Sequence, residues 1–374
     1  MASGLTLRGR SARPLVQGGM GVGISAHRLA GAVAREDCVG TISSVDLRRH
    51  HPDLMRETGR SRDRAVIERA NLIALDREIR AAREIAGGRG IIAVNVMRAV
   101  SQYAGYVKQA CESGADAIVV GAGLPFDLPE LTADYPDVSL VPILSEARAI
   151  GLVLKKWQRK GRLPDAIVIE HPRYAGGHLG AAKLDEVGDA RFDFSQVVPA
   201  TLRLFEEMGI APIPLVLAGG INTPQKVRDA LALGAAGVQV GTPFAVTEES
   251  DAHRNFKDVL AGARAEDIVT FMSVAGLPAR AVRTPWLARY LEKEAVFQRQ
   301  AKPRKSGCTL GWDCLAQCGL RDGKPGMGQF CIDHQLAAAM NGDTSHGLFF
   351  RGSEPVPFGR DIRPVKDLTE FLLA

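Results

Sequence analysis

Eight short apolar runs alternate with helical stretches along the first two-thirds of the chain, and this alternation constrains the fold more than any other feature. Such alternation is typical of parallel strands joined by crossover helices. Eight strand–helix units in about 240 residues match a (β/α)8 barrel, or TIM barrel, better than an open six-stranded sheet. The expected strands are residues 14–17, 39–43, 91–96, 117–120, 140–144, 166–170, 214–218 and 237–240.

The pattern changes after the eighth expected strand, which divides the 374 residues into three parts. Residues 1–250 are expected to form the barrel, with a segment inserted at 46–69 after the second strand. Residues 251–345 form a mostly helical accessory region that contains a Cys-rich loop at 308–331. Residues 346–374 are expected to return and pack on the barrel.

The inserted segment is rich in basic side chains, and two interpretations remain open. It could be a lid that gathers an anionic substrate, or a solvated face, which is the commoner role of a run of charges. The side chains concerned are Arg48, Arg49, His50, His51, Arg56, Arg60, Arg62 and Arg64.

The overall composition excludes several classes of protein. With 46% hydrophobic and 24% charged residues, the chain has globular proportions. The net charge of +5 arises from 47 basic and 42 acidic residues mixed along the chain, so no nucleic-acid partner is expected. The N-terminus lacks a signal-peptide core, and no apolar run is long enough to span a bilayer. We therefore expect a cytoplasmic protein without a membrane partner, and the sequence gives no signal for the number of subunits.

Polar residues and glycines that follow the strands should meet at one rim of the barrel, whatever their separation in sequence. The loops LAGGI (217–221) and QVGT (239–242) follow strands seven and eight, where phosphate sites are common. Glycine there lets backbone N–H groups approach phosphate oxygens, although it could also merely allow a tight turn. The cofactor-binding candidates at the rim are Gly219, Gly220, Gly241 and Thr242, together with Glu170, Gly176 and Gly177 after strand six.

His178 is the candidate catalytic residue, because it follows strand six in the flexible glycine loop AGGHLG and should face the rim. An imidazole with a near-neutral pKa suits proton transfer or orientation of a polar substrate.

A competing motif is the stretch GVGISA at residues 21–26, which has the G-x-G-x-x-A spacing of a dinucleotide-binding fold. Asp46 would then be the acid that binds the ribose. The eight strand–helix units and the second glycine site count against this alternative.

Seven stretches carry a resemblance to a known family, and they follow one another along nearly the whole chain. The chain resembles the nitronate monooxygenases, formerly 2-nitropropane dioxygenases, and the related FMN-dependent enoyl-acyl-carrier-protein reductases. The stretches are PLVQGGMG, IIAVNV, AGGHLG, VLAGGI, GVQVGTPFAVTEES, SVAGLPARAV and NGDTSHGLFFRGSEPVPFG.

The resemblance implies a flavin mononucleotide (FMN) cofactor and assigns roles to its residues. Gly19, Met20 and Asn95 would contact the isoalloxazine ring, and Ser353 would approach from the C-terminal return. The glycine loops after strands seven and eight would hold the phosphate. His178 would be the active-site histidine, which orients a nitronate or removes the α-proton of a neutral nitroalkane.

The implied reaction is oxidation of an alkyl nitronate or propionate 3-nitronate by dioxygen, which yields a carbonyl compound and nitrite. The alternatives are an NAD(P)H-dependent enoyl-thioester or quinone reductase and a non-catalytic flavin-binding protein. Arg173 departs from the family pattern before the histidine and could pair with an anionic substrate.

Four cysteines crowd into 24 residues near the C-terminus, more than packing requires. The spacing of Cys308, Cys314, Cys318 and Cys331 is compatible with a [4Fe-4S] cluster or a structural zinc, both of which take four thiolates. A set of inert thiols without a metal is the third possibility.

Overall fold

The computed structural model describes residues 4–308 and 314–374. Its centre is a closed barrel of parallel strands, and the predicted (β/α)8 barrel is therefore confirmed. Each predicted strand agrees with the observed one to within one residue at either end. In barrel order the strands are β3 (Leu15–Gln17), β4 (Val39–Ser43), β5 (Ile91–Met97), β6 (Ala117–Gly121), β7 (Ser139–Leu144), β8 (Ile167–Glu170), β10 (Leu215–Ala218) and β11 (Gly237–Val240).

Alternation along each strand decides which residues reach the interior of the barrel. On β5, Ile91 and Ala93 lie in the inner apolar core, and the alternate residues Ile92 and Val94 pack in the cluster that includes the surrounding helices. A further step of two residues brings Asn95 to the rim, and the same step leads from Val168 to Glu170 on β8. The alternation that places apolar side chains inside the barrel therefore also places polar side chains at its rim.

A short hairpin closes the opposite end of the barrel, and the sequence pattern did not predict it. Its strands are β1 (Leu5–Leu7) and β2 (Arg10–Ala12), which pair antiparallel. Leu5 and Leu7 are buried in the same apolar cluster as the inward-facing barrel residues. The barrel is therefore sealed at this end, and only the other end is open to a ligand.

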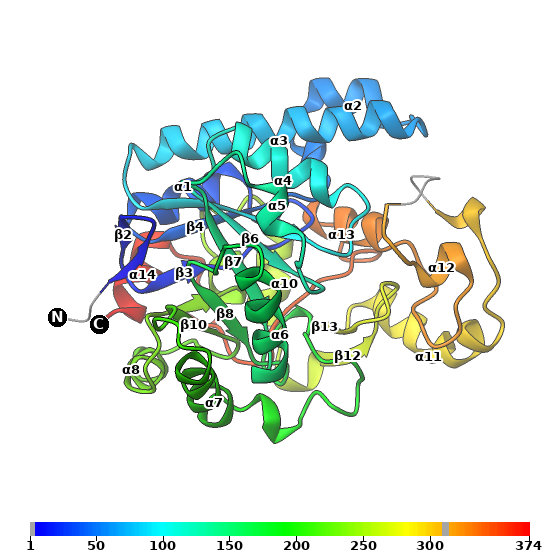
Figure 1. Ribbon diagram of the computed structural model, residues 1–374. Helices are drawn as coiled ribbons and strands as arrows, with labels where there is room; N and C mark the ends of the chain where they lie inside the picture. Colours follow the sequence, from blue (N-terminus) through cyan, green and yellow to red (C-terminus); the bar gives the residue numbers. More distant parts are fainter. Residues whose placement is uncertain (1–3, 309–313) are drawn as a thin grey trace.

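Helices surround the barrel, as Figure 1 shows. Helix α3 starts at Arg64 because Asp63 caps it, accepting from the N–H groups of Ala65 and Val66. The helices here are α1 (His27–Arg35), α2 (Pro52–Thr58), α3 (Arg64–Ala86), α4 (Tyr103–Glu112), α5 (Leu128–Leu131), α6 (Ala147–Gln158), α7 (Phe194–Glu207), α8 (Pro224–Ala232) and α9 (Thr242–Ala245), with a 3-10 turn at Leu47–His50.

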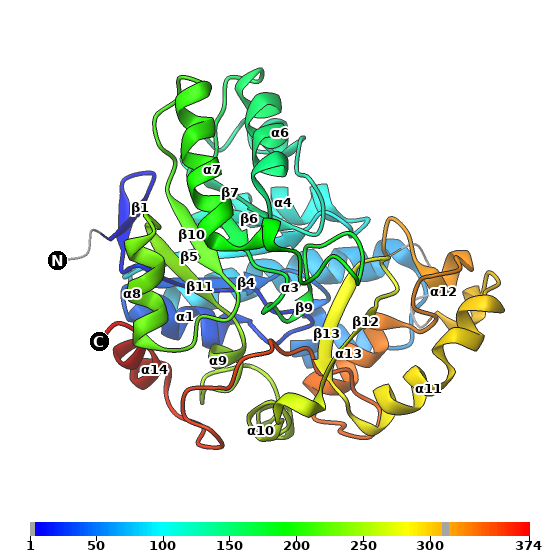
Figure 2. The same cartoon turned by 90° about the horizontal axis from the view of Figure 1, so that it is seen from below.

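The accessory region contains a sheet as well as the expected helices. Strands β12 (Ile268–Met272) and β13 (Pro278–Val282) form a hairpin, and β13 also pairs with β9 (Gly177–His178) from the loop after β8. The sequence analysis did not predict this sheet. Figures 1 and 2 show the accessory region at the opposite side of the molecule from the two chain ends. Its helices are α10 (Arg254–Gly262), α11 (Pro285–Arg299), α12 (Gly319–Asp322) and α13 (Ile332–Met340), and the chain ends in α14 (Val365–Leu372).

Two arginines of the inserted segment, Arg48 and Arg49, form buried ion pairs. Neither interpretation of the segment, as a lid or as a solvated face, predicted these pairs. Arg48 is 2% exposed, and its Nε donates to Asp46 at 2.8 Å. Arg49 pairs with Asp46 and also with Asp333 of α13, at 2.7 Å from Nη2 to Oδ2. These two side chains are not a solvated face, and their carboxylate partners leave them poorly suited to gather an anionic substrate. Arg49 fastens the insertion to the accessory region, whereas the side chain of Arg48 bonds within the insertion, to Asp46 and Thr58.

The dinucleotide-binding alternative is wrong, because carboxylates of the protein occupy the start of α1. The N–H groups of Ala26, Arg28 and Leu29 donate to Asp251, and that of His27 donates to Glu78. A pyrophosphate would need these same donors.

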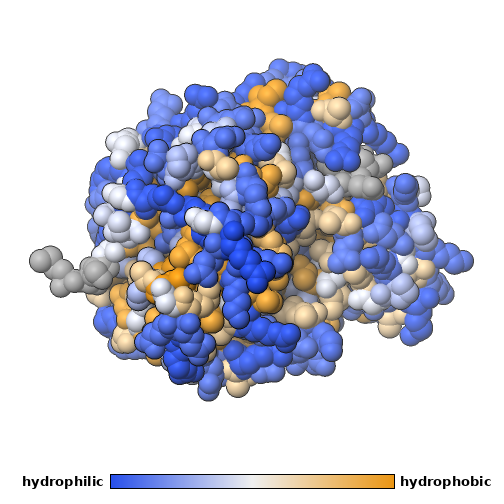
Figure 3. All heavy atoms as spheres, viewed as in Figure 1, coloured by the Kyte–Doolittle hydropathy of each residue, from blue (hydrophilic) through white to orange (hydrophobic). Residues whose placement is uncertain are grey.

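The surface seen in Figure 3 is predominantly hydrophilic, with apolar atoms in small separate patches. Within the described ranges, no helix combines the length and the apolar character needed to cross a membrane.

Candidate functional site

A cavity of about 330 Å³ lies at the open end of the barrel, between the strand ends and the accessory region. Cavities of this size are common at ligand sites. Among the predicted catalytic and cofactor-binding residues, Ser353 alone lies outside the cavity lining. Those that line it are Gly19, Met20, Asn95, Glu170, Gly176, Gly177, His178, Gly219, Gly220, Gly241 and Thr242.

The loops after β10 and β11 form a cradle, and the backbone of the first loop has a conformation that only glycine permits. Gly219 and Gly220 have φ values of 104° and 75°, which side chains rarely adopt. A Cβ at Gly220 would lie 2.8 Å from Cβ of Tyr174. Thr242 Oγ1 accepts the N–H of Gly352 at 2.9 Å, so its own proton remains to be donated. The cradle therefore fits the phosphate of a nucleotide cofactor such as FMN.

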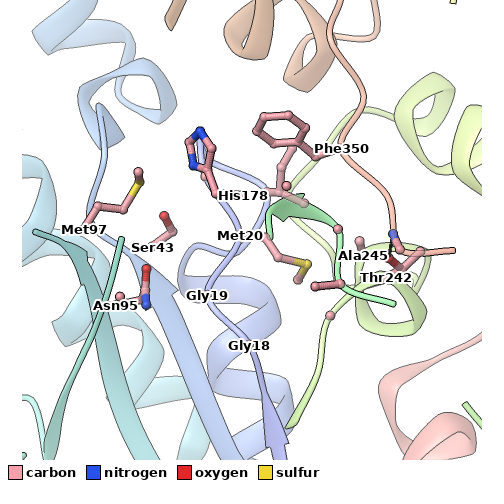
Figure 4. Close-up of a pocket in the computed structure, with 18 of the residues that line it drawn as sticks. Gly18, Gly19, Met20, Ser43, Asn95, Met97, His178, Thr242, Ala245 and Phe350 are labelled. Carbon is pink, nitrogen blue, oxygen red and sulfur yellow. Dashed lines mark hydrogen bonds between the residues drawn. The ribbon is translucent and has the colours of Figure 1, made fainter. Parts of the chain in front are cut away.

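The opposite wall is built on the segment after β3. A Cβ at Gly19 would lie 2.4 Å from Cβ of Asn95, so glycine is needed for the two strand ends to approach. Figure 4 shows Asn95 and Met97 on one side of this segment and Thr242 on the other. His178 and Phe350 stand above it in the same view. Both strand ends therefore contribute to one wall of the cavity.

The C-terminal return passes close to the cavity, which explains the place of Ser353. Gly352 lines the cavity, and a Cβ at Gly176 would lie 2.5 Å from its nitrogen. Ser353 donates its N–H to the carbonyl of Tyr174 at 3.2 Å. Its Oγ is buried and has no hydrogen-bond partner among the described residues. A bound anion would supply the acceptor that this hydroxyl lacks.

His178 lies in strand β9, so the sequence-based view of a flexible loop is wrong. It pairs with Ala279 of β13, and its Nε2 lies 3.0 Å from Ser273 Oγ. Burial lowers the pKa of His178 to about 4, well below the near-neutral value expected from the sequence. The imidazole is therefore neutral at pH 7 and acts there through its hydrogen bonds.

Glu170 is one of two acids with a raised, near-neutral pKa that line the cavity; the other is Asp333, which pairs with Arg49. Unlike Asp333, Glu170 has no hydrogen-bond or ion-pair partner among the described residues. Burial raises the pKa of Glu170 to about 7, because the charged form is poorly solvated there. At neutral pH, the Glu170 carboxyl is therefore protonated in a fraction of the molecules.

Sequence reasoning missed many of the residues that line the cavity, among them Ser43, Met97 and Phe350. Ser43 and Met97 end β4 and β5, so the rule that strand ends converge could have found them. Phe350, whose ring centroid lies 5.8 Å from that of His178, comes from the C-terminal return and carried no signal. Arg173, which we considered for an anionic substrate, does not line the cavity and donates to the carbonyl of Gly188.

The clustered cysteines do not assemble into a metal centre. In the part of the chain that the structure describes, no three His, Cys, Asp or Glu side chains are placed to hold an ion. Cys308 and Cys314 both pack in one small cluster with Ile67, and Cys314 also lines the cavity. Burial raises the pKa of the Cys314 thiol to about 12. The predicted cluster or zinc at Cys308, Cys314, Cys318 and Cys331 is not supported, and residues 309–313 of that loop lie outside the described ranges.

Comparison with known proteins agrees with the site. A family model described as nitronate monooxygenase matches residues 9–374. Nitronate monooxygenase from Pseudomonas aeruginosa is 37% identical over 116 residues, which cover 31% of this chain and 31% of the relative. Matches to the curated relatives span about a third of their length.

Two solved structures share the fold. FabK from Thermotoga maritima has a TM-score of 0.67 and 23% identity, and the match covers 96% of this chain and 91% of that chain. Nitroalkane oxidase from Streptomyces ansochromogenes has a TM-score of 0.64 and 18% identity, with 96% and 94% covered.

We predict that Glu170→Gln stabilises the protein at alkaline but not at acidic pH. Between pH 4.5, the ordinary carboxyl value, and about 7, the unfolded chain releases a proton that the folded chain retains. Burial of Glu170 therefore costs stability as pH rises through this window, and the full cost persists above it. The variant should melt about 2–4 °C above the wild type at pH 8, the shift that about 1 kcal/mol produces in a large domain.

Thermal melts at pH 4.5 and pH 8 check this prediction. Glu207→Gln, at the exposed end of α7, is the control and should not change the difference between the two pH values. An equal effect of Glu170→Gln at both pH values would contradict a buried, partly protonated carboxyl.

Proposed function

This chain belongs to the nitronate monooxygenase family, and we propose that it is an FMN-dependent oxidoreductase that oxidises nitronates with dioxygen. The substrates would be alkyl nitronates or propionate 3-nitronate, and the products a carbonyl compound and nitrite. One observation carries the proposal: His178 lines the same cavity as the two glycine loops that follow β10 and β11.

The residues that would hold FMN follow from the shape of the cavity. Gly219, Gly220, Gly241 and Thr242 would bind the phosphate, and the free hydroxyl of Ser353 would support it. Gly19, Met20 and Asn95 would face the ring. When bound, FMN supplies an electron acceptor that no amino-acid side chain provides.

The chain's own side chains would orient the substrate and keep water away from it. His178 is neutral and held in place, so it would form a hydrogen bond with a nitronate oxygen without adding charge. Leu315, Ile332 and Leu336 of the accessory region add an apolar wall that suits an alkyl chain. Exclusion of water strengthens the polar contacts that remain.

The cradle gives a direct prediction for cofactor binding. Gly220→Ala should weaken FMN binding at least about tenfold, because the new methyl group would displace Tyr174 and distort the loop. Gly209→Ala is a matched control: Gly209 has a similar φ of 62°, but a Cβ there would meet nothing within 4 Å. Titration of each apoprotein with FMN, followed by flavin fluorescence, makes the comparison. Equal affinities in two folded variants would remove these loops from the cofactor site.

The reaction itself is tested by anaerobic mixing of the FMN-loaded protein with substrates. Propionate 3-nitronate and an alkyl nitronate should each bleach the flavin absorption, and admission of dioxygen should restore it and release nitrite. Rapid bleaching by NADH or NADPH, with none by a nitronate, would instead establish the reductase alternative. Inertness to all of them would leave a flavin-binding protein.

A further inference from the structure

Ser273, in the turn between β12 and β13, holds the ring of the candidate catalytic histidine. Its Oγ lies 3.0 Å from Nε2 of His178, and the serine is 0% exposed. The same hairpin fixes the backbone of the histidine: His178 pairs with Ala279, and the N–H of Leu179 donates to the carbonyl of Pro278 at 3.0 Å. Backbone and ring of His178 are therefore positioned by one element.

The direction of the Ser273–His178 hydrogen bond follows from counting donors. Ser273 Oγ already accepts the N–H of Ala275 at 3.3 Å. A hydroxyl has one proton to donate. Among the described residues, Nε2 of His178 is the acceptor that the structure places within reach of Ser273 Oγ. If Nε2 carried the proton instead, the buried hydroxyl would have no acceptor, which is unfavourable.

The other ring nitrogen of His178 is available to a ligand. Nδ1 has no hydrogen-bond partner among the described residues. It is accessible, because it is absent from the set of fully buried polar atoms without a partner. Since His178 lines the cavity, this nitrogen is reached from there. Burial keeps the ring neutral by lowering the pKa of His178, so an unprotonated Nε2 requires a proton on Nδ1.

We propose that Ser273 is a positioning residue that fixes the tautomer of His178, so that the imidazole presents a proton on Nδ1 to the substrate. This inference rests on the proposed function and deepens it. An Nδ1–H group donates a hydrogen bond to an anionic nitronate oxygen. It cannot accept the α-proton of a neutral nitroalkane, because Nδ1 is already protonated and Nε2 is engaged by Ser273. His178 therefore selects the nitronate form of the substrate and does not generate it.

The tautomer can be observed without turnover, by nitrogen NMR of the FMN-loaded protein labelled with 15N-histidine. Protonated and unprotonated ring nitrogens have well-separated shifts, and His178→Asn identifies the signal. We expect Nδ1–H in the wild type and loss of this fixed tautomer in Ser273→Ala. A wild-type ring protonated at Nε2 would overturn the proposal, whatever the reaction of the enzyme.

Kinetics provide the second readout, as kcat/KM for a nitronate and for the corresponding nitroalkane. Ser273→Ala should lower kcat/KM for the nitronate about tenfold, the effect of one lost orienting contact, and Ser273→Thr should retain most of it. Ser113→Ala, which removes a hydroxyl that contacts Asp76, is the control. Faster use of the nitroalkane than of the nitronate by the wild type would contradict a donor role for His178. A wild type inactive on both would refute the proposed function, while the NMR result would still decide the tautomer.

Discussion

Strand β9 contains two residues, Gly177 and His178, and its pairing with β13 is the contact on which the site depends. The loop after β8 is long, and the barrel alone gives it no regular partner. Pairing with the hairpin turns it into a defined strand. Arg280 of β13 adds to this by donating to the carbonyls of Pro172 and Ala175 within the same loop. The accessory region is therefore part of the site, since it decides where the imidazole stands.

The barrel supplies the other half of the site through its alternation of side chains. On β5 and β8 the interior positions are apolar up to the rim, where the two series end in Asn95 and Glu170. The β1–β2 hairpin closes the opposite end of the barrel, so the polar groups at the rim face one cavity. Burial affects both titratable groups in the same way, by disfavouring their charged forms. It lowers the pKa of His178 and raises that of Glu170, so at pH 7 the imidazole is neutral and the carboxyl is partly protonated.

The sequence predicted the barrel well, because buried parallel strands are nearly continuous apolar runs bounded by glycine. Rim residues were also within reach, since strand ends converge in any barrel. The β12–β13 hairpin could not be predicted, because the sequence of β13 is PARAV and carries no strand signal of its own. Its formation depends on tertiary contacts. The pairing of Arg49 with Asp333, 284 positions away, is likewise a tertiary contact that the sequence pattern does not reveal. The low pKa of His178 depends on its burial, which the sequence also did not show.

The central claim is that the barrel rim and the β12–β13 hairpin together place His178 against a cofactor held by the two glycine loops. A crystal structure of the protein with FMN tests this most directly. The account predicts the phosphate between the loops of Gly219–Gly220 and Gly241–Thr242, with the His178 ring facing the flavin and still bonded to Ser273. A phosphate bound elsewhere, or a His178 ring turned away from the flavin, would contradict it.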